Sequence, residues 1–127
     1  MFANGVVVKP SSMFAYKPTH LMVDGILRLP LPTVYEVDWF LTWATRKVNM
    51  KPIAPLFVNE TALMISGIQL IADSHISVAI SKASAAFFCD VFSCREFSIS
   101  TILDFILTSF DFKQYRHKVI LRMVPPT

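Results

Sequence analysis

Apolar and polar positions alternate over several stretches of the chain, and a period of two is typical of strands with one buried face. His20–Leu27 is the first of these runs, and Pro30 and Pro32 end it because proline cannot donate to a strand ladder. Turns are expected at Asn59–Glu60 and Ser81–Ser84. Around these turns the pattern predicts an extended segment at residues 52–58 and strands at residues 62–72, 75–80, 85–93 and 115–124.

Two other stretches carry the period of a helix. Thr33 and Glu36 have the spacing of a capping box, in which each side chain bonds the backbone of the other residue. A helix is therefore expected from there to about Asn49. Its buried stripe consists of apolar residues three or four positions apart, namely Val34, Val37, Phe40, Leu41, Ala44 and Val48. Ser98 or Ser100 can cap a second helix that ends near Phe110.

The order of these elements predicts the fold class. A strand, a helix, four extended segments, a second helix and a last strand favour an α+β protein. We expect a two-layer α/β sandwich, with a mainly antiparallel sheet and two helices packed on one face. Residues 1–18 are interpreted as an N-terminal arm and residues 19–127 as one domain. The phenylalanines are expected in the core, among them Phe87, Phe88, Phe105 and Phe110.

Composition adds an expectation about assembly. The chain has 127 residues, of which 54% are hydrophobic and 17% charged, so it is more apolar than an average soluble domain. A domain of this size has little interior in which to hide that surface, and we predict a homodimer or a larger homo-oligomer. No segment approaches the roughly 20 apolar residues of a membrane span, and the N-terminus lacks a secretory signal. A cytoplasmic protein without a membrane partner is expected.

Charge and cysteine usage exclude little but point away from three kinds of site. The formal net charge is +3, and the basic residues are spread out apart from a group near the end of the chain: Lys113, Arg116, Lys118 and Arg122. A solvated strand face explains that group better than nucleic-acid binding. Cys89 and Cys94 lie five positions apart, which places them on opposite faces of a strand. We therefore expect neither a disulfide nor a metal site.

Four motifs resemble those of the small, bacterial-type S-adenosylmethionine decarboxylases. In the family patterns given below, h stands for an apolar residue. The resemblance covers about residues 19–124. Cys94 follows Ser74 by 20 positions and Ser74 follows Ser66 by 8, the intervals found in that family. The motifs are HLMVD at residues 20–24, similar to H-L-h-V-D; ISG at 65–67, similar to V-S-G; ADSHISV at 72–78, similar to A-E-S-H-I-S-I; and FCDVFSC at 88–94, similar to A-V-D-V-F-T-C.

The resemblance implies a pyruvoyl enzyme that makes its own cofactor. Ser74 would attack the carbonyl before it, and the chain would be cut between Asp73 and Ser74 to leave a pyruvoyl group. This ketone would form a Schiff base with the substrate amine and accept electrons as carbon dioxide leaves. By the same resemblance Ser66 assists processing and Cys94 protonates the product carbon. His75, next to the cut, is a further candidate catalytic residue.

The implied substrate is S-adenosylmethionine, and the implied product serves spermidine and polyamine synthesis. In this family aromatic side chains stack on the adenine, and cation–π attraction favours the sulfonium. Phe57 is the candidate for the stacking residue because it precedes the Ser66 strand. A scaffold of this kind could also decarboxylate another amino acid, such as ornithine or arginine.

One position departs from the family pattern. The family has a second histidine five residues after the cleavage serine, where it acts as a base in processing, and this chain has Ala79 there. Alanine cannot move a proton, which leaves three outcomes open. Another group could rescue slow processing, or processing could stall at the peptide or the ester. The protein could also be a catalytically impaired paralogue that binds a nucleoside-like ligand or partners an active subunit. His75 lies on the same strand face as Ala79 and could substitute.

Overall fold

The computed structural model of the chain describes residues 2–3, 6–7, 18–123 and 125. Most of the expected N-terminal arm, residues 1–18, lies outside the described residues. Within it, β1 (Phe2–Ala3) pairs antiparallel with β2 (Val6–Val7).

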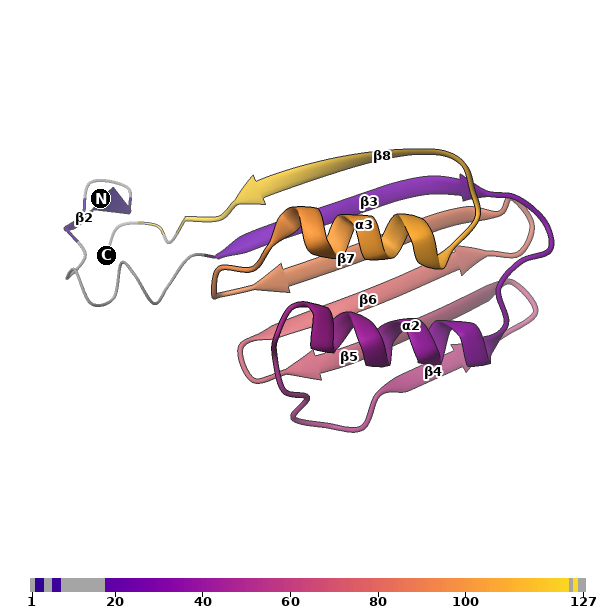
Figure 1. Cartoon of the computed structure of the whole chain (residues 1–127), viewed down its shortest axis with the longest axis horizontal. Helices are drawn as coiled ribbons and strands as arrows, with labels where there is room; N and C mark the ends of the chain where they lie inside the picture. Colours follow the sequence, from indigo (N-terminus) through magenta and orange to yellow (C-terminus); the bar gives the residue numbers. More distant parts are fainter. Residues whose placement is uncertain (1, 4–5, 8–17, 124, 126–127) are drawn as a thin grey trace.

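The other described strands form one antiparallel sheet of six strands in the order β4-β5-β6-β7-β3-β8. Helices α2 (Val34–Lys47) and α3 (Ile99–Ser109) lie side by side on one face of it (Figure 1). This arrangement confirms the predicted α+β sandwich. The strands are β3 (Thr19–Leu27), β4 (Phe57–Glu60), β5 (Met64–Ile71), β6 (Ser74–Ser81), β7 (Ala86–Ser93) and β8 (Phe112–Leu121).

Burial alternates along the central strands, so the sheet has two chemically different faces. The face under the helices carries buried apolar side chains: Leu21, Val23, Ile65, Ile71, Ile76, Val78, Ile80, Phe87, Cys89 and Val91. The opposite face, here called the open face, has none of the described helices over it (Figure 1). Its central and β4-side positions are His20, Met22, Asp24, Phe57, Ser66, Ile68, Leu70, His75, Ser77, Ala79, Phe88, Asp90 and Phe92.

Helix α2 begins and ends as its sequence dictates. The Thr33 hydroxyl accepts a hydrogen bond from the Glu36 N–H (3.3 Å), and the Glu36 carboxylate accepts one from the Thr33 N–H (3.1 Å), so the predicted capping box is confirmed. At the other end Asn49 adopts a positive φ of 59°. The Asn49 and Met50 N–H groups then bond back to the carbonyls of the last turn, as in a Schellman motif.

Two expectations were wrong. Asn59 and Glu60 belong to β4 rather than to a turn, because Thr61 makes the turn: its hydroxyl accepts the N–H groups of Leu63 and Met64. Phe88 is not a core residue, since its side chain is 46% exposed on the open face. Its neighbour Phe87 is buried, and consecutive strand residues point to opposite faces.

Candidate active site

Strand pairing brings Ser74 and Cys94 to the same end of the sheet. Ser74 is the first residue of β6, and its backbone pairs with Ile71 on one side and with Ser93 on the other. Cys94 follows Ser93 directly. The β6–β7 hairpin therefore brings Cys94 back beside Ser74, although the two residues are 20 positions apart in the sequence. In Figure 1 this end of the sheet also holds the end of α2 and the start of α3.

Asp73 is the residue on which hydrogen bonds at this end converge. Its backbone carbonyl accepts the Cys94 N–H (3.4 Å). One oxygen of its carboxylate accepts the Ser74 hydroxyl (3.1 Å), and the other accepts Arg95 Nε (2.8 Å). The Arg95 N–H in turn donates to the Ser93 hydroxyl (2.9 Å). The carbonyl before Ser74 is thus already polarised, and the Ser74 hydroxyl already has an acceptor.

The two cysteines have different surroundings. Cys89 is buried under the helices, where burial and the neighbouring carboxylate of Asp90 raise the pKa of its thiol far above the ordinary value. Such a thiol is inert as a proton donor or nucleophile near neutral pH. Cys94 is also a free thiol but only partly buried, and it adjoins the Asp73–Ser74 peptide. Cys94 is therefore the cysteine that can exchange a proton with a bound molecule.

A cavity of about 500 Å³ opens beside this end of the sheet. It lies between the segment after α2 and the segment before α3, and Asp73 and Arg95 reach it from the strand ends. Lys47 and Lys51 also line it, so its lining carries both basic and acidic side chains. Its volume lies within the range of small-molecule pockets. The remaining lining residues are Val48, Asn49, Met50, Ile71, Ala72, Glu96, Phe97 and Ser98.

His75 lies at the same end but on the open face, in a cluster that sequence reasoning missed. Its ring lies 5.7 Å from the ring of Phe92, centroid to centroid. His20 approaches Phe92 from the other side (6.2 Å) and bonds Asp90 through Nε2 (2.9 Å). The guanidinium of Arg122 lies 5.0 Å from the centre of the Phe92 ring. We call these five residues the Phe92 cluster.

The Phe92 cluster keeps His75 neutral over a wider pH range than usual. Burial is the main cause that lowers the pKa of His75 below its ordinary value of 6.5. The positive charges of His20 and Arg122 add to it, while Asp90 opposes them. A neutral imidazole can accept a proton, but alternation places the His75 ring on the opposite face of β6 from the Ser74 side chain.

Ser66 and Phe57 lie away from the Asp73–Ser74 peptide. Ser66 pairs with Ala79 across the open face, and it lies five positions along β5 from Ile71, the partner of Ser74. At roughly 3.3 Å per residue that is about 16 Å. Phe57 lies on the same face of β4, opposite Ile68, with 63% of its side chain exposed. Within one chain the structure brings neither residue to Ser74.

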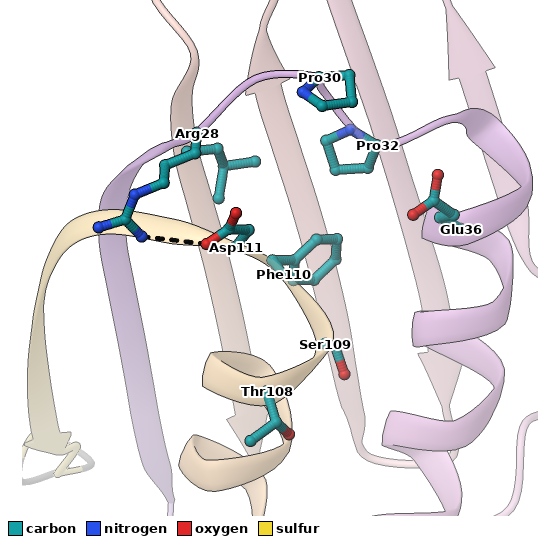
Figure 2. Close-up of a pocket in the computed structure, with 9 residues that line it drawn as sticks. Arg28, Pro30, Pro32, Glu36, Thr108, Ser109, Phe110 and Asp111 are labelled. Carbon is teal, nitrogen blue, oxygen red and sulfur yellow. Dashed lines mark hydrogen bonds and ion pairs between the residues drawn. The ribbon is translucent and has the colours of Figure 1, made fainter.

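A second pocket, drawn in Figure 2, lies at the opposite end of the sheet and has a volume of about 410 Å³. Arg28 forms an ion pair there with Asp111 (3.1 Å). The Glu36 carboxylate belongs to the capping box, and the hydroxyls of Thr108 and Ser109 donate to carbonyls of their own helix. Each of these polar side chains already has a protein partner, so this pocket shows no group held ready for a ligand.

Two findings bear on other classes of site. Among the described residues, no three His, Cys, Asp or Glu side chains come together as metal ligands. No helix in the described part of the chain is long and apolar enough to cross a membrane.

Comparison with known proteins identifies the family and agrees with the fold. The sequence profile of S-adenosylmethionine decarboxylase matches residues 20–123. Among solved structures, the crystal structure of the adenosylmethionine decarboxylase from Aquifex aeolicus is similar, with a TM-score of 0.71 and 20% sequence identity over 88% of this chain and 95% of that chain. No curated protein matches the sequence significantly. Because the family profile spans nearly the whole described domain, this chain belongs to the S-adenosylmethionine decarboxylase family.

Proposed function

We propose that this protein decarboxylates S-adenosylmethionine, using a pyruvoyl group that forms when the chain cuts itself between Asp73 and Ser74. The observation that carries the proposal is the Asp73–Ser74 peptide, whose carbonyl accepts the Cys94 N–H (3.4 Å) and whose serine hydroxyl is bonded (3.1 Å). A backbone N–H aimed at a carbonyl stabilises the negative charge that forms when a nucleophile attacks it.

The residues present fit a pyruvoyl group derived from Ser74. When formed, that group withdraws electrons from the substrate's α-carbon as carbon dioxide leaves. The protein's own residues hold the substrate beside Ser74, at the start of β6, and return a proton to the substrate's α-carbon. Cys94 is the proposed donor, because its thiol is partly exposed next to Ser74 whereas the Cys89 thiol is buried.

A second copy of the chain is part of the proposal. Ser66 and Ala79 face each other on the open face about 16 Å from the Ser74 position, by the roughly 3.3 Å rise of a strand residue. Ser66 of one copy can assist processing only if it lies near Ser74 of a second copy. A homodimer in which the open face of one copy meets the Ser74 end of the other copy's sheet would supply this contact. It would also cover Phe57, which we propose as the aromatic residue that stacks on the adenine.

A second candidate function rests on Ala79. A chain without a proton-transfer group at this position could stop at the ester and keep only a binding or partner role. Phe88 and Ser66 flank Ala79 in the sheet, and neither can replace an imidazole as a base. Ala79→His restores the family residue and is expected to speed conversion of the ester to the ketone. An unchanged rate would count against this explanation.

The release of labelled carbon dioxide from carboxyl-labelled S-adenosylmethionine tests the function. We expect release by the wild-type chain and none by Ser74→Ala, which has no hydroxyl from which a ketone can form. Cys94→Ala should lower the turnover rate by about 100-fold or more, the usual contribution of a positioned acid. Cys89→Ala is the matched control and should retain turnover. Ornithine and arginine, each carboxyl-labelled, serve as alternative substrates, and release from either one alone would reassign the substrate.

A further inference from the structure

We propose that the Asp73 carboxylate is the base that takes the proton from the Ser74 hydroxyl during self-cleavage, and that Arg95 positions this carboxylate. The inference rests on the proposed function and adds to it a residue for the first step of processing. Sequence motifs point to Asp73 only as the residue whose peptide bond is cut. The structure indicates a second role for Asp73, which belongs to its side chain.

The geometry around Asp73 carries the proposal. The Ser74 Oγ donates to one carboxylate oxygen at 3.1 Å, which is within the range from which a base abstracts a proton. Arg95 Nε holds the other oxygen at 2.8 Å. The backbone of Arg95 is itself fixed, because its N–H donates to the buried Ser93 hydroxyl at 2.9 Å. The carboxylate is therefore held from one side and presents its free side to the nucleophile.

Other candidate bases lie in the wrong place. His75 adjoins Ser74 in sequence, but its ring packs toward Phe92 on the open face. Position 79 is five residues further along β6, and a side chain there cannot reach the Ser74 hydroxyl of its own chain. Lys47 and Lys51 line the neighbouring cavity, but Ser74 is not among the residues that line it.

The step balances without any further reactant. The Ser74 O–H proton moves to Asp73, and the Ser74 oxygen forms a bond to the carbonyl carbon of Asp73. The negative charge on the carbonyl oxygen is held by the Cys94 N–H. The C–N bond then breaks, the leaving nitrogen takes the proton back from the Asp73 carboxyl group, and the peptide has become an ester. Asp73 ends the step as a carboxylate again.

The experiment follows newly made, radiolabelled full-length chain in a cell-free synthesis and chase. Hydroxylamine cleaves esters, so treated samples on a denaturing gel report ester plus finished product, and untreated samples report the finished product alone. We expect Asp73→Asn to slow the appearance of the hydroxylamine-sensitive ester by about 100-fold or more. Asp73→Glu should recover much of the rate, and Ser74→Ala should give no ester. Urea unfolding of the Asp73→Asn chain checks that it is folded.

Arg95 needs a readout that distinguishes positioning from stability. We expect Arg95→Gln to slow ester formation and Arg95→Lys to restore part of it. The double variant Asp73→Asn/Arg95→Gln should be no slower than Asp73→Asn alone, because Arg95 acts through Asp73.

The outcomes separate this inference from the proposed function. A folded Asp73→Asn chain that forms ester at the wild-type rate overturns the role of Asp73 and leaves self-cleavage standing. A wild-type chain that forms no ester and no fragments overturns both.

Discussion

At the scale of single residues, the site depends on neighbours that no motif announces. Ser74 and Cys94 could be linked because their motifs and the interval between them resemble those of a known family. Arg95 and Ser93 carried no such signal, since an arginine and a serine at a strand end usually face solvent. The hydrogen bond from Arg95 to Asp73 and the one from the Arg95 N–H to Ser93 appear only once β6 and β7 are in register. The same holds for His20 and Asp90, which lie 70 positions apart.

His75 makes stability depend on pH in a predictable direction. Because the folded pKa lies below the ordinary value of 6.5, the unfolded chain binds a proton there more readily than the folded chain. This contribution to folding is fully present above pH 6.5 and is lost as the pH falls below it. Urea unfolding between pH 7.5 and 5 should show a smaller loss for His75→Asn than for wild type. Equal slopes would contradict the pKa shift, as would an NMR titration of His75 centred at or above 6.5.

Gly25 is predicted to be important for stability because the backbone around it leaves no room for a side chain. A Cβ added there would come within 2.8 Å of the Gln114 carbonyl oxygen and 2.7 Å of the Phe112 ring. Because backbone cannot move aside as a side chain can, Gly25→Ala should destabilise the fold by about 1–3 kcal/mol. Gly67→Ala is the matched comparison, since its closest contact is the tip of the Leu41 side chain (2.7 Å). Urea unfolding should show the larger loss for Gly25→Ala, and the reverse order would be evidence against this explanation.

At the scale of elements, local signals predicted most of the fold. The capping box, the helical stripe of α2 and the alternation in β5, β6 and β7 are all local patterns, and each was confirmed. The boundary at Asn59–Glu60 failed because asparagine favours turns, while pairing with Ser66 and Ile65 holds these residues in β4. Strand order depends on pairing between residues far apart in the chain, so local patterns could not predict that β3 lies between β7 and β8.

The cap of α2 supplies a prediction at this scale. Thr33→Ala removes a hydroxyl that accepts the Glu36 N–H and should lower the free energy of unfolding by about 0.5–2 kcal/mol. Thr42→Ala is the control in the same helix. The Thr42 hydroxyl donates only to the preceding turn, and alanine has the higher helix propensity, so this variant should be neutral or slightly stabilising. Thermal unfolding of both variants checks this, and equal midpoints would contradict the role of the cap.

At the scale of the whole molecule, the open face is the surface of the sheet that no helix of the described residues covers. The helices bury the other face over the central strands but leave β8 exposed, whereas Phe88, Leu70 and Phe57 leave apolar surface exposed on this one. Exposed apolar surface of this kind marks association sites. The edge strand β8 is a poorer candidate, because its basic residues discourage edge-to-edge pairing with another copy.

We therefore predict a homodimer that depends on the open face. Phe88→Asp places a charge in the middle of that face and should shift the protein from dimer to monomer in analytical ultracentrifugation. Tyr35→Asp makes a similar change on α2, in the helical layer, where the side chain is 81% exposed. It should leave the dimer intact. A monomeric wild type, or a dimer lost only in Tyr35→Asp, would contradict the assignment of this face.

The most direct test of self-processing is the intact mass of the purified protein, measured with and without prior hydroxylamine treatment. Attack by the serine oxygen on the preceding backbone predicts a break between residues 73 and 74, spontaneous if the ketone forms and hydroxylamine-dependent if the ester persists. Substitution of that serine by alanine should abolish the break. A single unbroken 127-residue wild-type chain under both conditions would contradict the account.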